Sequence, residues 1–165
     1  SSPVRSFSCC ATALGMAQQL KDLTGLDYVE GYGMSETMAA THINPPHRPK
    51  PQCLGIPVFD VDARVVDPAT FAELPPGEIG EIVVHGPQVM QGYWNNPQAT
   101  ADSFVTLDGK RFLRTGDLAR KYEGAYFFMV DSPHRMITAS GFTLLPISSS
   151  ALCYPHPPIH CVCVT

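Results

Sequence analysis

The sequence predicts an α/β chain in which a helix and a short strand precede a small, mostly antiparallel β unit. Two patterns support this fold class. Apolar residues recur at helical spacing between residues 13 and 23, and short apolar runs bounded by Gly, Pro or Asp recur between residues 61 and 130. In addition, the 16 Pro and 13 Gly among 165 residues favour many turns and short strands over long helices.

The first part of the chain is predicted to begin with one amphipathic helix over residues 13–23, which Thr24-Gly25 ends. A strand over residues 26–30 then runs into a turn at residues 31–33. Residues 35–40 are expected to begin either a second helix or a loop. The apolar face of the first helix is formed by Leu14, Ala17, Leu20 and Leu23.

The β unit is expected to follow a proline-rich surface loop over residues 44–51, with a boundary near Gly55. A short helix with Pro in its first turn is predicted over residues 96–104. Ser132-Pro133 is a breaker, so a second boundary is placed after Asp131. The predicted strands cover residues 61–66, 79–84, 112–115 and 125–130.

Composition and charge exclude several classes of function. The net charge of −4 provides no basic surface for nucleic acid, so a small-molecule or protein partner is favoured. No run approaches the roughly 18 consecutive apolar residues of a membrane-spanning helix. We expect a cytoplasmic protein, with an organelle or peripheral membrane attachment as alternatives. The six Cys are unevenly placed, which favours reduced thiols.

Residues 30–37 combine an aromatic ring, glycines, hydroxyls and a carboxylate within one short segment. This mixture suits a nucleotide. Tyr32 can stack on a purine, Ser35 and Thr37 can contact phosphate oxygens, and the Glu36 carboxylate can hold Mg²⁺. The alternative is a polar turn in which Glu36 is simply solvated.

A second segment of interest, residues 114–117, places Asp117 after a glycine at the end of a predicted strand. One carboxylate can accept hydrogen bonds from two vicinal hydroxyls, which is the arrangement that a ribose presents. The alternative is an ordinary hairpin Gly-Asp.

In this order and at this spacing, the two segments resemble the adenylate-forming superfamily, which includes acyl-CoA synthetases, luciferases and the adenylation domains of peptide synthetases. The resemblance continues through residues 77–82, 86–94 and 96–100. It implies three parts. These are the end of an α/β AMP-binding subdomain over residues 1–54, a small antiparallel β-barrel-like subdomain over 55–130, and a hinge with the start of a truncated, small α+β C-terminal domain over 131–165.

The resemblance implies a role for each matching residue. Tyr32 is expected to stack on adenine, Asp117 to bind the ribose hydroxyls, and Glu36 to coordinate Mg²⁺. Ser35, which stands where the family more often has Thr, is expected to contact the α-phosphate. The complete predicted nucleotide-binding set is Gly31, Tyr32, Gly33, Met34, Ser35, Glu36, Thr37 and Asp117.

Departures from the family pattern bear on activity. Residues 8–12 replace a Gly-rich turn by Ser-Cys-Cys-Ala-Thr, whose side chains crowd the position of the base. At the hinge, Asp131 is the retained pivot, whereas Ser132 and His134 replace an Arg and a Lys. The family's phosphate loop and catalytic Lys are expected to lie outside the chain. No catalytic residue is therefore assigned, and the chain alone is expected to be inactive.

An intact relative is expected to activate a carboxylic acid, with a fatty acid as the leading candidate, and to transfer it to CoA. This makes ATP, Mg²⁺ and CoA the predicted cofactors, and a small carboxylic acid the predicted substrate. Two alternatives remain open. One is a catalytically inactive remnant or nucleotide-binding module of the family, and the other is the adenylation domain of a peptide synthetase.

Overall fold

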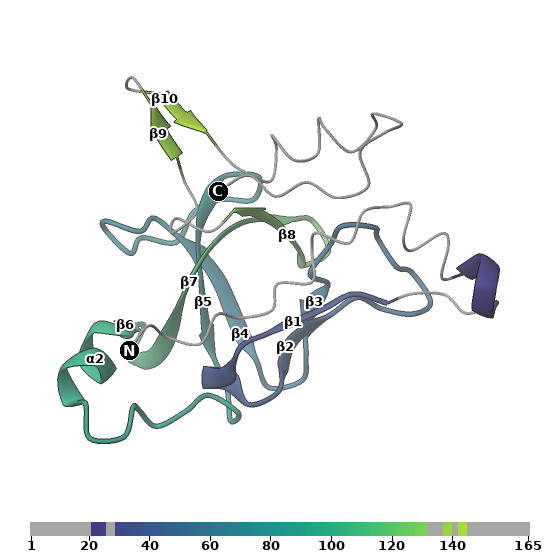
Figure 1. Cartoon of the computed structure of the whole chain (residues 1–165). Coiled ribbons are helices and arrows are strands. Elements are labelled where there is room, and N and C mark those ends of the chain that lie inside the picture. Colours follow the sequence, from purple (N-terminus) through teal and green to yellow (C-terminus); the bar gives the residue numbers. More distant parts are fainter. Residues whose placement is uncertain (1–20, 26–28, 132–136, 140–141, 145–165) are drawn as a thin grey trace.

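The computed structural model describes residues 21–25, 29–131, 137–139 and 142–144 (Figure 1). Its largest element is a curved antiparallel sheet of five strands. In this sheet β6 and β8 lie one after the other along the same edge of the long strand β7, and β5 lies on the other edge. Its strands are β4 (Asp62–Val66), β5 (Ile79–His85), β6 (Phe104–Leu107), β7 (Lys110–Tyr122) and β8 (Tyr126–Asp131).

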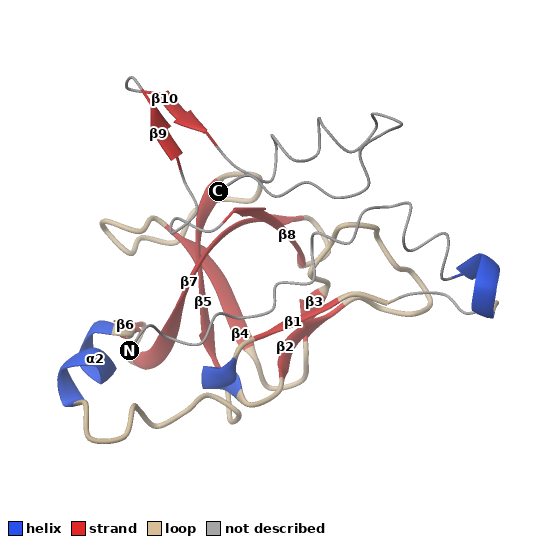
Figure 2. Ribbon diagram, in the orientation of Figure 1, coloured by secondary structure: helices blue, strands red, loops and turns tan. Residues whose placement is uncertain are grey.

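A smaller antiparallel sheet precedes the large one. It consists of β1 (Gly31–Gly33), β2 (Ala40–Ile43) and β3 (Ile56–Pro57), in that order. A 3-10 turn, η2 (Ser35–Thr37), connects the first two of these strands. Two further strands, β9 (Ile137–Ala139) and β10 (Phe142–Leu144), form a separate hairpin. Figure 2 shows that strands dominate the described part of the chain and that its helices are short.

The predicted fold class is confirmed, because the described chain is mostly antiparallel sheet with few helices. The predicted strands over residues 61–66, 79–84 and 125–130 match β4, β5 and β8 closely. The predicted helix over residues 96–104 is α2 (Pro97–Asp102), and the Asn96 side chain caps it by accepting a hydrogen bond from the Ala99 backbone N–H.

Other expectations need correction. Residues 31–33, predicted as a turn, form strand β1, because they pair with β2 from Gly31 opposite Ile43 to Gly33 opposite Ala40. The strand predicted over residues 112–115 extends over all of β7. Strand β6 was missed, because residues 104–107 were partly assigned to the preceding helix. Of the helix predicted over residues 13–23, only residues 21–23 lie within the described part of the chain, and these are helical.

The core lies mainly on one face of the curved sheet. Both faces of β5 are covered, since five successive residues of this strand are buried. A smaller cluster of Val66, Val83 and Phe112 fills the opposite face. The main cluster consists of Tyr32, Leu54, Ala63, Val65, Ile82, Val84, Leu113, Ala119 and Phe127. One predicted nucleotide-binding residue, Tyr32, is therefore also a core residue.

Gly55 joins the two sheets. Phe127 of β8 donates its backbone N–H to the Gly55 carbonyl at 2.9 Å, and the Leu54 N–H donates to the Phe127 carbonyl at the same distance. Gly55 has a φ of +100°, and a Cβ at this position would lie 2.1 Å from the carbonyl carbon of Ile43. Only glycine fits this crossing, which holds β1 and β2 against the large sheet.

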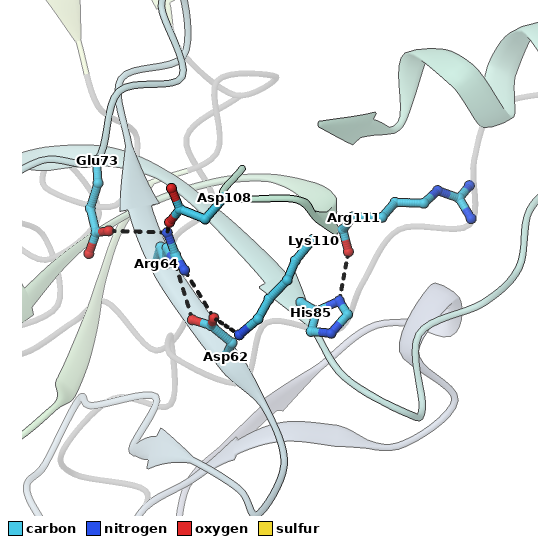
Figure 3. A network of polar contacts seen from close by, with 7 residues as sticks. All are labelled: Asp62, Arg64, Glu73, His85, Asp108, Lys110 and Arg111. Atoms are coloured by element: carbon cyan, nitrogen blue, oxygen red, sulfur yellow. Dashed lines mark hydrogen bonds and ion pairs between the residues drawn. The ribbon is translucent and has the colours of Figure 1, made fainter. Parts of the chain in front are cut away.

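A polar network covers one end of the large sheet (Figure 3). Arg64 of β4 pairs with Asp62 at 3.1 Å, with Glu73 at 3.5 Å and with Asp108 in the turn between β6 and β7. Lys110 also pairs with Asp62 at 3.1 Å. Most of these acidic partners are well exposed to solvent, so each pair contributes little to stability.

Within the described residues, no helix is both long and apolar enough to cross a membrane. The structure does not test the predicted domain divisions at residues 54/55 and 130/131, which stay predictions.

Candidate functional site

The tertiary structure brings the two sequence motifs into direct contact. The Tyr32 hydroxyl of β1 donates a hydrogen bond to Oδ2 of Asp117 in β7 at 2.8 Å, although 85 positions separate these residues in the sequence. Both side chains are buried, with 2% and 6% of their surface exposed. The predicted adenine contact and the predicted ribose contact are thus neighbours within one site.

Asp117 was predicted at the end of a strand but lies inside β7. The pairing register between β5 and β7 shifts between Glu81 and Val83, opposite this point. Gly116 permits the irregularity with a φ of +70°. The Asp117 backbone N–H donates to the Thr115 hydroxyl at 3.2 Å, and that hydroxyl donates to the Ile82 carbonyl at 2.8 Å. The Asp117 carboxylate is therefore presented from a β-bulge rather than from a hairpin.

Glu81 holds this bulge in place. Its side chain is 3% exposed. Oε2 of Glu81 accepts hydrogen bonds from two nitrogens of the Arg114 guanidinium, from Nη2 at 2.8 Å and from Nε at 3.2 Å. The Gly116 backbone N–H donates to its Oε1 at 3.1 Å. Sequence reasoning missed this role. The available signal was a carboxylate within the otherwise apolar run of residues 79–84, where a buried charge requires partners.

His42 of β2 packs behind Tyr32. The two ring centroids lie 5.7 Å apart, and the His42 ring meets the Phe127 ring edge-on at 4.6 Å. Nδ1 of His42 shares a hydrogen bond with the Thr41 hydroxyl at 3.0 Å. Burial lowers the pKa of His42 to about 3, so the ring is neutral at physiological pH. Sequence reasoning did not single out this residue.

The turn that carries the predicted phosphate contacts separates its two hydroxyl residues. Thr37 is fully buried, and its hydroxyl lies 2.9 Å from the carbonyls of both Met34 and Ala39 while accepting the Met34 N–H at 3.1 Å. Ser35, in contrast, is exposed. In this structure Thr37 shapes the turn, and Ser35 is the hydroxyl residue that faces solvent.

Met34, Gly33 and Gly31 of the predicted nucleotide-binding set differ in how tightly the surrounding structure constrains them. Met34 is partly buried and packs against the main core cluster. At Gly33 a Cβ would lie 2.9 Å from the Ala39 carbonyl oxygen, so this position requires a residue without a side chain. Gly31 is less constrained, because a Cβ there would make an ordinary contact at 3.4 Å with the His42 carbonyl oxygen.

The surroundings of Glu36 fit the predicted Mg²⁺. Glu36 is 8% exposed, and its Oε1 accepts a hydrogen bond from the Tyr93 hydroxyl at 2.9 Å. Its Oε2 is buried and has no hydrogen-bond partner among the described residues. A buried carboxylate oxygen without a donor is a suitable ligand for a hard cation. No group of three or more metal-ligating side chains occurs in the described ranges.

Asp131, the predicted hinge pivot, is the last residue of β8 and pairs opposite Leu118. The backbone of the predicted pivot therefore lies in the strand next to the Asp117 bulge. The divergent hinge positions Ser132 and His134 and the divergent segment at residues 8–12 lie outside the described residues. Their predicted effects stay predictions, as do the ligand contacts of the whole nucleotide-binding set.

A comparison with known protein families matches residues 1–94 to the family described as AMP-binding enzyme. Because the match covers more than half of the chain, the chain belongs to the AMP-binding enzyme family, as its two motifs predicted. This membership places it in the adenylate-forming superfamily.

The chain is also similar in sequence to individual CoA ligases. The chain is 37% identical over 150 residues to a long-chain-fatty-acid–CoA ligase of Bacillus subtilis, covering 90% of this chain and 26% of that protein. It is also 37% identical over 148 residues to 4-coumarate–CoA ligase-like 6 of Arabidopsis thaliana, covering 88% and 26%. The chain thus spans about a quarter of the length of these curated relatives.

Among solved structures, ATP-bound MatB from Rhodopseudomonas palustris superimposes with a TM-score of 0.78 at 33% identity, covering 87% of this chain and 28% of that one. The long-chain-fatty-acid–CoA ligase FadD1 from Archaeoglobus fulgidus superimposes with a TM-score of 0.68 at 27% identity, covering 87% and 29%. The described fold is therefore shared with both of these solved structures.

Proposed function

We propose that this chain is the part of an AMP-forming acyl-CoA ligase that binds the nucleoside and the metal-bound phosphates of ATP. The observation that carries the proposal is the direct contact between Tyr32 and Asp117, beside a turn in which a buried oxygen of Glu36 has no donor within the part of the chain that the structure describes. Membership of the AMP-binding enzyme family supports the choice of nucleotide.

Each residue has a defined task in this proposal. Asp117 accepts hydrogen bonds from the ribose hydroxyls, and the hydrogen bond from Tyr32 holds its carboxylate in position. Tyr32 supports the adenine, and Ser35 contacts the α-phosphate. Gly31 and Gly33 of β1, together with Met34 and Thr37 of the following turn, supply the backbone that carries these side chains. Glu36 Oε2 would hold Mg²⁺, which neutralises phosphate charge when bound.

In the whole protein, the reaction proposed is a two-step ligation. A carboxylate oxygen of the acid attacks the α-phosphorus of ATP, and the bond from that phosphorus to the bridging oxygen breaks to release pyrophosphate. The CoA thiol, losing its proton, then attacks the acyl carbonyl, and AMP leaves with the former carboxylate oxygen. This chain's residues bind and orient the nucleotide in both steps.

We propose that the acid has an apolar body and favour a fatty acid over an aromatic acid. The names of two relatives, a long-chain-fatty-acid–CoA ligase and a 4-coumarate–CoA ligase-like protein, correspond to these two classes of acid in that order. Testing the whole protein with both classes of acid, by the release of pyrophosphate, separates them. Pyrophosphate release that depends on an amino acid would support a peptide-synthetase adenylation domain instead.

The chain by itself is proposed to bind nucleotide without completing the reaction, because it spans only about a quarter of the length of its curated relatives. We expect no carboxylate-dependent exchange of pyrophosphate into ATP from the 165-residue chain. Exchange at the rate of a complete ligase would contradict this expectation. Nucleotide binding without exchange would also be the behaviour of the alternative, an inactive nucleotide-binding module, and pyrophosphate release by the whole protein distinguishes the two.

Glu36→Gln provides the most direct test of the nucleotide site. The substitution keeps the shape of the side chain but removes the charge that we assign to Mg²⁺. We expect ATP affinity in the presence of Mg²⁺ to fall roughly tenfold or more, and affinity in excess EDTA to stay unchanged. Calorimetric titration of the chain with ATP measures both values.

Glu78→Gln is the matched control, because Glu78 is exposed and lies outside the site. Its ATP affinity should equal that of the unmodified chain in both buffers. Equal losses in the two variants, or no loss at Glu36, would contradict the assignment of Glu36 to the metal.

A further inference from the structure

The loop of residues 86–94, between β5 and α2, docks on the turn that carries Glu36. The Met90 backbone N–H donates to the Glu36 carbonyl at 2.8 Å, and the Tyr93 hydroxyl donates to Glu36 Oε1 at 2.9 Å. One short loop therefore contacts both the backbone and the side chain of this residue. Sequence reasoning treated residues 86–94 as part of the family resemblance and assigned them no role in the site.

Other contacts fix the loop independently of Glu36. The Tyr93 backbone N–H donates to the Thr100 hydroxyl of α2 at 2.9 Å. The Arg111 guanidinium of β7 donates to the Gln91 carbonyl from two nitrogens, at 3.1 and 3.2 Å. Because α2 and β7 both anchor the loop, the position of Tyr93 does not depend on its hydrogen bond to Glu36 alone.

The two oxygens of Glu36 consequently differ in their surroundings. Oε1 is occupied by the Tyr93 hydroxyl, whereas Oε2 is buried with no hydrogen-bond partner among the described residues. A carboxylate restrained through one oxygen loses rotational freedom, so the direction of its other oxygen is set in advance. Restraint of this kind favours binding of a ligand by lowering the entropy lost when the ligand binds.

The phenol of Tyr93 remains a proton donor under ordinary conditions. Its pKa is raised, first by burial and then by its hydrogen bond to Glu36 and the charge of that carboxylate. The neutral hydroxyl can therefore donate to Oε1 throughout the physiological pH range.

We propose that Tyr93 is a positioning residue for the metal-bound nucleotide: by holding Glu36 Oε1, it leaves Oε2 aimed at the divalent cation that accompanies ATP. The proposal rests on the proposed nucleotide site and adds a residue from a separate loop to it. Tyr93 itself is not assigned to touch either the metal or the nucleotide.

Tyr93→Phe in the full 165-residue chain tests this role, because it removes only the hydroxyl. The probe is Mn²⁺ with ATP, with bound Mn²⁺ followed by electron paramagnetic resonance. We expect the Mn²⁺ concentration for half-maximal binding to rise about tenfold, since a hydrogen bond to a charged group is lost. ATP binding measured in excess EDTA should not change. A purely structural role of Tyr93 would lower both affinities together.

Tyr122→Phe is the control, because Tyr122 lies on β7 and is 43% exposed; its Mn²⁺ midpoint should match that of the unmodified chain. Thr100→Ala is a second variant, which loosens the loop through the Tyr93 backbone and should shift the Mn²⁺ midpoint in the same direction. It keeps the test decisive if Tyr93→Phe folds poorly.

The outcomes separate the two levels of the proposal. Metal-dependent ATP binding by the unmodified chain, with unchanged midpoints in both loop variants, overturns the role of Tyr93 and leaves the nucleotide site standing. If the unmodified chain binds no ATP with or without metal, the nucleotide site and the role of Tyr93 both fall.

Discussion

Arg114→Met is expected to lower the free energy of unfolding of this chain by about 3 kcal/mol, because it removes the charged partner of the buried Glu81 carboxylate. The Glu81 carboxylate, which is 3% exposed, would keep only the Gly116 N–H among its contacts described above. Its desolvation would then be largely uncompensated. Urea unfolding at neutral pH, followed by circular dichroism, measures the loss.

The Arg114→Met substitution should affect the candidate nucleotide site as well as the stability of the chain. Glu81 holds the bulge that presents Asp117, so a shift of this segment also disturbs the contact between Asp117 and Tyr32. We therefore expect Arg114→Met to weaken ATP binding at temperatures where the variant is still folded, by calorimetric titration.

Lys110→Ala is the matched control within the same strand. Lys110 also pairs with a carboxylate, that of Asp62, but its side chain is 51% exposed and the pair lies in the surface network of Figure 3. Its removal should cost less than about 1 kcal/mol. If both variants lose the same stability, the distinction between an ion pair with a buried carboxylate and a pair in the surface network is wrong.

The second large effect is expected on acidification, and His42 is its source. The pKa of this ring is lowered from 6.5 to about 3 by burial, so the unfolded chain takes up a proton before the folded chain does. The contribution of the neutral ring is complete above about pH 6.5 and is lost progressively as the pH falls towards the folded pKa. At about pH 4.5 the loss from this one residue should be about 3 kcal/mol.

His42→Leu isolates this contribution. Leucine does not titrate, so the free energy of unfolding of the variant should fall less steeply between about pH 6.5 and pH 4.5 than that of the unmodified chain. The comparison uses slopes, because the variant also loses the hydrogen bond between Nδ1 and Thr41 and starts from a different stability. Urea unfolding at a series of pH values yields both slopes.

His47→Gln is the control for this experiment, since His47 is exposed and the variant replaces a histidine outside the core. Carboxylates with lowered pKa values, such as Asp62 beside Arg64, also lose stabilisation in acid. Their effect is common to all three chains and cancels in the comparison. Parallel slopes for the unmodified chain and His42→Leu would show that the ring is not protonated on unfolding.

The sequence predicted those elements whose local pattern is strong. Strands β4, β5 and β8 are continuous apolar or alternating runs between turn residues, and α2 has both an Asn cap and a Pro in its first turn. Strand β1 escaped prediction because its Gly-Tyr-Gly sequence has weak strand propensity and becomes extended by pairing with β2. The full length of β7 escaped because Gly116 interrupts the pattern in its middle.

The same contrast applies to the candidate site. The sequence alone identified the members of the two motifs, since residue type and close spacing are enough to suggest a nucleotide site around Tyr32, Glu36 and Asp117. It did not identify Glu81 and Tyr93, because their importance comes from partners that lie 33 and 57 positions away along the chain. No local pattern distinguishes them from other polar residues.

The sequence by itself thus determined the family, the antiparallel character of the chain and the chemical groups available to the site. Only the tertiary structure decided that Tyr32 contacts Asp117, that Thr37 is enclosed while Ser35 is exposed, and that the two oxygens of Glu36 have different surroundings. The physical reason is that local propensity and periodicity act over a few residues. Pairing across the sheets depends instead on burying many distant groups together, and these pairings set which polar atoms find partners.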